Sequence, residues 1–175
     1  DEIFLVDAYA QIYRGFYAIP PLSNSKGIPS NAVFGLSKFL FRMMRDIKPD
    51  FGAFVFDKGA PTARLDLAPD YKANRAPMPD EMRAQIPYVR RLISALGWPL
   101  CELEGYEADD LLAGVTQNYQ TDKVCIISPD KDLSQLVNNQ VRILVPDTKG
   151  ELKERGEKEI LEKFEVLPCQ IVSYL

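Results

Sequence analysis

Short apolar runs that alternate with longer polar and helical segments constrain the fold of this chain most strongly. The runs cover residues 3–6, 51–56, 98–103, 123–128 and 141–145. Continuous apolar runs of this length are typical of strands that are covered on both faces of a sheet. The segments between most of them contain helical patterns of about 10–18 residues, long enough for the crossovers that join parallel strands. The pattern predicts one α/β domain over residues 1–175, with a parallel sheet and helices on both faces.

Helical periodicity is strongest over residues 31–47, where apolar side chains recur every three or four positions until Pro49. Further helices are expected at about 80–95, at 107–119, near 156–164 and after Pro168. Residues 59–79 are rich in proline and glycine and have a basic centre. That composition predicts an exposed loop or a loosely helical lid.

The chain contains no histidine among its 175 residues. Ser-His-Asp and Cys-His catalysis, imidazole proton relays and histidine-containing zinc sites are therefore excluded. Any catalysis must depend on carboxylates, Lys, Tyr, Cys or a bound metal. The formal net charge of −4, from 21 basic and 25 acidic residues, at first argues against a nucleic-acid partner.

Acidic residues follow three of the expected strands and open one helix. Because parallel strands end at the same edge of a sheet, these carboxylates are expected to converge there. Each acid alone is explained by helix capping or by the helix dipole, but together they would repel one another strongly. Divalent cations relieve such repulsion. The seven acids, taken as candidate metal ligands, are Asp7, Asp57, Glu107, Asp109, Asp110, Asp130 and Asp132.

A donor set made only of carboxylate oxygens suits Mg²⁺ or Mn²⁺ better than zinc. So many carboxylates in a small volume suggest two ions, about 3.5–4 Å apart, that clamp the attacking and leaving oxygens of a phosphoryl centre. Such a pair generates hydroxide without a histidine. Setting these seven acids aside leaves fewer acids than the 21 basic residues, so the rest of the chain is mildly basic and compatible with phosphate contacts.

Basic and aromatic side chains are concentrated in the expected lid, directly after Asp57. They are Arg64, Tyr71, Lys72, Asn74 and Arg75. Cations beside an acidic metal cluster can hold the non-bridging oxygens of a phosphodiester, and tyrosine can stack on an unpaired base. Arg14, shortly after the first strand, is a weaker candidate of the same kind. The plain alternative is a solvated surface loop.

The cysteines and the hydropathy pattern indicate a reduced, cytoplasmic protein. Cys101, Cys125 and Cys169 are an odd set without a C-x-x-C pair, so a disulfide framework is not expected. Cys101 and Cys125 lie in apolar runs and are predicted to be small buried thiols. No apolar run reaches the roughly 18 residues of a membrane helix, and no segment resembles a signal peptide.

Five motifs in this order resemble the bacterial 5′ nuclease family, which includes the 5′-3′ exonuclease domain of DNA polymerase I and its stand-alone relatives. The motifs are VDAYAQIYRGFYAIPPL from residue 6, VFD from 55, YKANRAPMP from 71, EGYEADDLL from 104 and PDKDLSQLV from 129. The resemblance implies a PIN-like fold and metal-dependent cleavage of DNA at 5′ flaps and 5′ ends in replication and repair. A linked polymerase domain is a further implied partner.

Position by position, the resemblance matches the seven acids to the family's metal-binding residues, with Glu107 and Asp109 acting more often through water. It matches Lys72 and Arg75 to basic residues of an arch through which a single 5′ strand passes. Asp57, Asp110, Lys72 and Arg75 are thus the expected catalytic residues, and Arg14, Arg64, Tyr71, Lys72 and Arg75 the expected substrate contacts.

Two departures from the family pattern stand out. Pro129 replaces a small residue before Asp130, and the family continues beyond residue 175 into a further acidic motif and a helical hairpin that grips duplex DNA. We therefore expect a truncated domain with weak or no activity of its own. A non-catalytic module that binds DNA structures stays open as an alternative.

Two other enzyme classes fit the motifs less well. A Toprim-like enzyme would use Asp130 and Asp132 but would have Glu in place of Asp7. A haloacid-dehalogenase-like phosphatase would have an acid or Thr in place of Tyr9.

Overall fold

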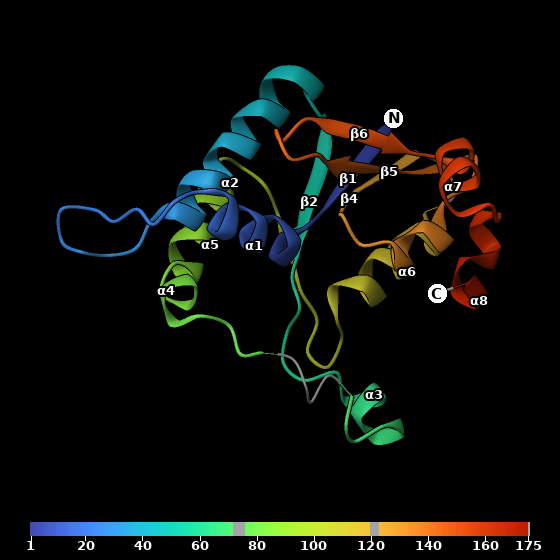
Figure 1. Ribbon diagram of the computed structural model, residues 1–175, viewed down its shortest axis with the longest axis horizontal. Coiled ribbons are helices and arrows are strands. Elements are labelled where there is room, and N and C mark those ends of the chain that lie inside the picture. The colour runs from blue at the N-terminus through green and yellow to red at the C-terminus, as the bar shows by residue number, and fades with distance from the viewer. Residues whose placement is uncertain (72–75, 120–122, 175) are drawn as a thin grey trace.

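The computed structural model describes residues 1–71, 76–119 and 123–174, so Lys72, Asn74 and Arg75 of the expected arch lie outside the described residues. Its centre is a six-stranded sheet in the order β3-β2-β1-β4-β5-β6 (Figure 1). The first five strands in this order run parallel, and β6 pairs antiparallel with β5. The strands are β1 (Glu2–Asp7), β2 (Phe51–Val55), β3 (Leu100–Cys101), β4 (Lys123–Ile127), β5 (Val141–Pro146) and β6 (Leu152–Arg155). The predicted α/β class is confirmed.

Helices cover both faces of the sheet, because neighbouring strand residues alternate between two cores. Phe4 and Val6 of β1 join one core, and Leu5 between them joins the other. The first core includes α1 (Ala8–Ala18), α2 (Asn31–Arg42), α4 (Asp80–Arg83) and α5 (Ile86–Ala95). The second includes α6 (Ala108–Asn118), α7 (Glu157–Phe164) and α8 (Ile171–Tyr174).

The strand register places the acidic strand ends side by side. Asp7 pairs with Val55 of β2, and Val6 pairs with Ile127 of β4. The polar residues that follow these strands therefore leave the sheet at one edge. Helix α3 (Thr62–Leu67) lies beyond this edge, at the bottom of Figure 1, inside the segment predicted to be a loosely helical lid.

Helices α1 and α2 pack with their backbones close together. A Cβ placed on Gly35 would lie 2.5 Å from the Cα of Gly15, which is closer than real contacts allow. Glycine at both positions therefore lets the two helices approach. Helix α2 continues as a π-helix (Met43–Ile47) and ends at Lys48, in the left-handed conformation just before Pro49.

The helix predicted over residues 80–95 is broken into α4 and α5 around Gln85. Gln85 is fully buried, and its Oε1 accepts hydrogen bonds from the backbone N–H groups of Ala32 at 2.8 Å and Val33 at 3.2 Å. Its Nε2 donates to Asn31 Oδ1 at 2.9 Å. The break thus brings one amide to the N-terminus of α2, whose first N–H groups lack helical partners.

Three further features differ from the sequence expectations. Helix α1 and strand β6 have no counterpart among the expected elements, and β3 has two residues rather than six. Cys101 is exposed because this short strand is at the sheet edge, so its predicted burial is wrong. Cys125 is buried as predicted, and burial raises the pKa of its thiol to about 12. Among the described residues, no helix has the length and apolar character to cross a membrane.

Candidate functional site

Asp7 ends β1 and caps α1, so its carboxylate is fixed between strand and helix. Its Oδ1 accepts from the N–H of Ala10 at 3.1 Å, and its Oδ2 accepts from the hydroxyl of Ser128 at 2.9 Å. Burial raises the pKa of Asp7, despite these hydrogen bonds, and the charges of Asp57 and Asp130 add to the rise. The carboxylate of Asp7 is therefore close enough to Asp57 and to Asp130 to be repelled by each of them.

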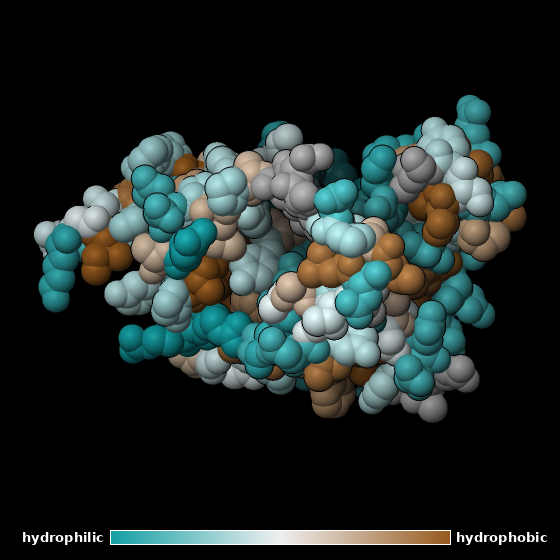
Figure 2. Space-filling view, turned by 90° about the horizontal axis from the view of Figure 1, so that it is seen from below, coloured by the Kyte–Doolittle hydropathy of each residue, from teal (hydrophilic) through white to brown (hydrophobic). Residues whose placement is uncertain are grey.

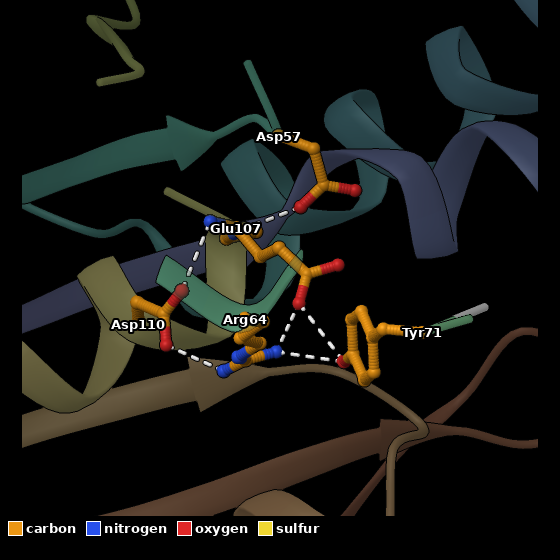
Figure 3. Close-up of polar contacts among 6 residues, drawn as sticks. Asp57, Arg64, Tyr71, Glu107 and Asp110 are labelled. Carbon is orange, nitrogen blue, oxygen red and sulfur yellow. Dashed lines mark hydrogen bonds and ion pairs between the residues drawn. The ribbon is translucent and has the colours of Figure 1, made fainter. Parts of the chain in front are cut away.

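Asp57 links the end of β2 to the start of α6. Its Oδ1 accepts a hydrogen bond from the N–H of Ala108 at 2.6 Å (Figure 3). An N–H in the first helical turn has no partner within the helix and favours an anion. The same contact holds Asp57 beside Glu107, the residue that precedes α6.

Glu107 and Asp110 share one basic partner at the start of α6. Arg64 of α3 donates to Glu107 Oε2 through Nη1 and to Asp110 Oδ1 through Nη2 (Figure 3). Asp110 also accepts from the backbone N–H of Glu107 at 3.0 Å. Glu107 is buried, with 7% of its surface exposed, so it needs such a charge partner.

Tyr71 completes this cluster from the far end of the lid. Its hydroxyl donates to Glu107 Oε2 at 3.1 Å and accepts from Arg64 Nη1 at 2.9 Å. The guanidinium carbon of Arg64 also lies 5.6 Å from the centre of the Tyr71 ring. Burial alone would lower the pKa of Arg64, but the bond to Tyr71 and the charges of Asp110 and Glu107 raise it above its usual value.

Asp130 and Asp132 lie in the turn after β4. The N–H of Asp130 donates to Ser128 Oγ at 3.2 Å, and the N–H of Asp132 donates to Asp130 Oδ1 at 2.9 Å. Arg155 of β6 fixes this turn by donating to the backbone oxygen of Asp130 at 2.9 Å. Burial lowers the pKa of Arg155, and the charge of Asp130 opposes that effect.

Two groups of acids thus lie at the same edge of the sheet. Asp7 interacts electrostatically with Asp57 and with Asp130, and Glu107 and Asp110 are held by Arg64. Asp109 lies in the first turn of α6, and Asp132 is exposed at the start of the turn's 3₁₀ helix. Within the described ranges, no three Asp, Glu or Cys side chains are close enough together to hold one metal ion. The seven predicted ligands therefore stay a prediction.

The chemistry of these residues fits a hard divalent cation. The donors are carboxylate oxygens, one of them on a buried glutamate and one on an aspartate whose pKa is raised partly by neighbouring acids. A positive group, Arg64, already lies between two of them. Binding of an ion by Glu107 and Asp110 therefore requires that the Arg64 contacts open.

The predicted basic residues fall in different places. Arg64 and Tyr71 contact the acids, whereas Arg14 donates to the backbone oxygen of Asp147, in the turn between β5 and β6. Lys72 and Arg75 are outside the described residues. Seen from the side of the acidic edge, Figure 2 shows hydrophilic side chains interspersed with smaller hydrophobic areas.

Sequence reasoning missed the residues that position the acids. Ser128 is fully buried and connects Asp7 with Asp130, and its one signal is a hydroxyl directly after an apolar run. Glu102 holds Lys58, next to Asp57, at 3.3 Å and Arg90 at 2.8 Å. No spacing rule in the sequence connects Glu102 with Lys58 or with Arg90, because the three residues come from separate parts of the fold.

Gly105 brings the lid against the start of α6. Its φ of +80° favours glycine, and a Cβ there would lie 2.9 Å from Thr62 Oγ1. The N–H of Gly105 donates to the backbone oxygen of Lys58 at 3.2 Å. The turn before Glu107 is thus packed against both the start of α3 and the residue after Asp57.

Comparison with known proteins agrees with this fold. Residues 2–165 match the family model described as the 5′-3′ exonuclease, N-terminal resolvase-like domain. A 5′-3′ exonuclease of Aquifex aeolicus is 40% identical over 176 residues, covering 99% of this chain and 60% of the relative. DNA polymerase I of Bacillus subtilis is 35% identical over 176 residues, covering 98% of this chain and 20% of the polymerase. The chain thus spans only part of the length of these relatives.

Solved structures share the fold at low sequence identity. T5 5′-exonuclease with bound zinc ions has a TM-score of 0.72 and 18% identity, covering 99% of this chain and 65% of that protein. The catalytic core of Rad2 in complex with DNA substrate has a TM-score of 0.64 and 20% identity, covering 98% of this chain and 52% of that one. With the family match over nearly its whole length, the chain belongs to the 5′-3′ exonuclease N-terminal, resolvase-like domain family.

Proposed function

We propose that the chain is the acidic-site domain of a metal-dependent 5′-3′ exonuclease and 5′ flap endonuclease that hydrolyses DNA phosphodiesters. The observation that carries this proposal is the convergence of acids from β1, β2, β4 and α6 at one sheet edge, with the pKa of Asp7 raised by burial and by its neighbours. Mg²⁺ or Mn²⁺ is the proposed cofactor. DNA with a 5′ flap or a 5′ single-stranded end is the proposed substrate, in the cytoplasm.

Bound divalent cations would supply the positive charge that a phosphodiester needs while it is attacked and while its leaving oxygen departs. The chain's own residues supply position. Ser128 and Ala10 orient the carboxylate of Asp7, and the N–H of Ala108 orients that of Asp57. Because these contacts come from strand ends and a helix start, the oxygens that face the substrate are held by rigid elements.

In this proposal Arg64 has two alternative partners, the acids at the start of α6 and a phosphate oxygen of the DNA. In the structure it neutralises Glu107 and Asp110, and Tyr71 holds it there. When cations neutralise those acids instead, its guanidinium becomes available for a phosphate oxygen, which it can bind with two N–H donors. Metal binding and substrate contact by α3 are therefore coupled in this proposal.

A cleavage assay tests the proposal. A 5′-flap DNA labelled at its 5′ end is incubated with the chain and Mn²⁺, alongside Asp57→Asn and Asp110→Asn. We expect slow but measurable cleavage by the wild type and a loss of at least about a hundredfold in each variant, because removing a charge-stabilising group at a reacting centre costs that much. Arg83→Gln, far from the acids, is the control. Equal cleavage by all four proteins would contradict the proposal.

A non-catalytic DNA-binding module is the second candidate. It is favoured by the Arg64 contacts and by the finding that no three acids in the described part of the chain are grouped for one ion. This alternative predicts flap binding that is unchanged by Mn²⁺, with no cleavage at any metal concentration. The same assay, read by both binding and cleavage, separates the two.

A further inference from the structure

Two arginines from different helices converge on the turn between β5 and β6, away from the acids at Glu107. Arg42 of α2 donates to the backbone oxygen of Lys149 at 3.2 Å, and Arg14 of α1 donates to that of Asp147. A Cβ on Gly150 would lie 3.1 Å from Arg42 Nη1 and 3.4 Å from Arg14 Nη2. The two guanidinium groups therefore meet around a residue that has no side chain.

A cavity of about 650 Å³ opens at this point, between α1, α2 and the hairpin turn. Its lining includes the close contact of Gly15 and Gly35, which brings the two helices together. Figure 1 shows the turn between β5 and β6 reaching toward α2. The cationic residues that line the cavity are Arg14, Lys38, Arg42, Arg45 and Lys149.

Little negative charge balances these cations. Asp46 forms an ion pair with Arg45 and also interacts electrostatically with Arg42. In the described part of the chain no carboxylate forms an ion pair with Arg14, Lys38 or Arg42. The carboxylate of Asp147 is engaged by the N–H groups of its own turn and by Lys153 at 3.7 Å. Each guanidinium carries five N–H donors, of which a single carbonyl contact uses only one or two.

We propose that this cavity binds backbone phosphates of DNA, with Arg14 and Arg42 as the central pair. Charge complementarity selects a polyanion, and paired guanidinium groups suit the oxygens of a phosphate. The proposal rests on the function proposed above and extends the DNA contact to a surface outside the acidic site.

The position of Arg14 supports this occupant. Arg14 comes seven positions after Asp7, the cap of the same helix, so both lie on one face of α1. The distance along the helix is about 10 Å. This corresponds to about three base-pair steps of B-DNA, so one DNA molecule reaches both sites.

The most direct test adds a negative charge to the cavity and leaves its arginines in place. Gly150→Asp places a carboxylate against both guanidinium groups, and Gly150→Asn places an amide of the same shape there. Both residues tolerate the positive φ of this position better than most. We expect Gly150→Asp to weaken binding of 5′-flap DNA about tenfold at 50 mM NaCl, with Gly150→Asn within about threefold of wild type.

Binding is measured by fluorescence anisotropy in EDTA, so that it does not depend on cleavage. In a plot of log affinity against log salt concentration, the slope for Gly150→Asp should be smaller than that of the wild type by the amount that about two phosphate contacts contribute. Equal affinity of the Asp and Asn variants would overturn the proposal, as would a wild-type chain that does not bind flap DNA at 50 mM NaCl. Failure of the proposed nuclease function would give a different result, in which the chain binds flap DNA but does not cleave it when Mn²⁺ is added.

A second pair of variants guards against misfolding at Gly150. Lys38→Gln with Arg42→Gln removes two charges from the cavity, and Lys158→Gln with Lys163→Gln removes two from α7. We expect the first double variant to weaken DNA binding about tenfold and the second less than threefold, with equal melting temperatures. Equal weakening by both would show a net-charge effect and overturn the proposal.

Discussion

Arg64 donates a hydrogen bond to the buried carboxylate of Glu107, so that helix α3 is tied to the start of α6 by a charged contact. The same guanidinium reaches Asp110. A protein cation therefore lies where the proposed function requires a divalent ion, and the two compete for the same oxygens.

Replacing Arg64 should tighten metal binding in the absence of DNA. In Arg64→Gln the carboxylates of Glu107 and Asp110 no longer have this cation as a partner, so their mutual repulsion favours an added ion. We expect the Mn²⁺ dissociation constant to fall about tenfold, or about 1.4 kcal/mol, in isothermal titration calorimetry. Arg83→Gln is the matched control, because among the described residues the guanidinium of Arg83 has polar contacts with the backbone oxygen of Met78 and with the exposed Asp80, not with the site acids. Unchanged affinity in Arg64→Gln would show that the bridge does not compete.

The raised pKa of Asp7 predicts a pH-dependent cost to folding. Folded Asp7 releases its proton at a higher pH than the unfolded residue, whose pKa is about 3.9. Ionisation therefore lowers the free energy of unfolding as pH rises above about 4. Asp7→Asn cannot ionise and should gain stability relative to wild type between pH 4 and pH 7, measured by urea unfolding in EDTA.

The control for Asp7 is Asp46, whose replacement should change stability with pH in the opposite direction. Arg45 lowers the pKa of Asp46, so this exposed carboxylate stabilises the fold above its unfolded pKa and loses that effect as pH falls. Asp46→Asn should lose a little stability relative to wild type as pH rises. If Asp7→Asn and Asp46→Asn change in the same direction, burial of Asp7 is not the cause.

The close approach of α1 and α2 predicts opposite effects for one substitution at two glycines. In Gly35→Ala the new methyl group collides with Gly15, and we expect a loss of about 1–3 kcal/mol in the free energy of unfolding. In Gly114→Ala no atom of the described residues outside its own helix turn lies within 4 Å of the new methyl group, and higher helix propensity should add about 0.5–1 kcal/mol. Chemical denaturation measures both. A stabilising Gly35→Ala would mean that the helices are further apart.

Gln85 should be costly to replace even by a residue of similar size. Gln85→Met leaves the buried N–H of Ala32 and the N–H of Val33 without their side-chain acceptor, so we expect a loss of about 2–3 kcal/mol. Gln135→Met, at an exposed position, should change stability by less than about 0.5 kcal/mol. A loss below about 1 kcal/mol at Gln85 would show that its amide does not cap α2.

The strands and the grouping of strand-end acids could be predicted from sequence because both are local signals. An apolar run identifies a buried strand, and parallel pairing then brings Asp7, Asp57 and Asp130 to one edge. No such signal exists for β6. Its residues LKER are mostly charged, and it joins the sheet through backbone pairing with β5.

The partners of the site residues could not be predicted for a different reason. Arg64 meets Glu107 only because α3 lies near the start of α6, and Arg14 meets the β5–β6 turn through a contact 133 residues away in sequence. Gln85 interrupts a segment whose periodicity favours one helix, because its amide is needed at α2. Periodicity reports which face of a segment is buried, not which polar groups it meets.

The two outer strands of the sheet bear on how the chain behaves at high concentration. Strand β3 has two residues, and β6, at the opposite side, carries Lys153, Glu154 and Arg155 in its four. Short or charged outer strands give a second molecule little open backbone with which to pair. The sheet is therefore protected at both sides against extension into intermolecular aggregates.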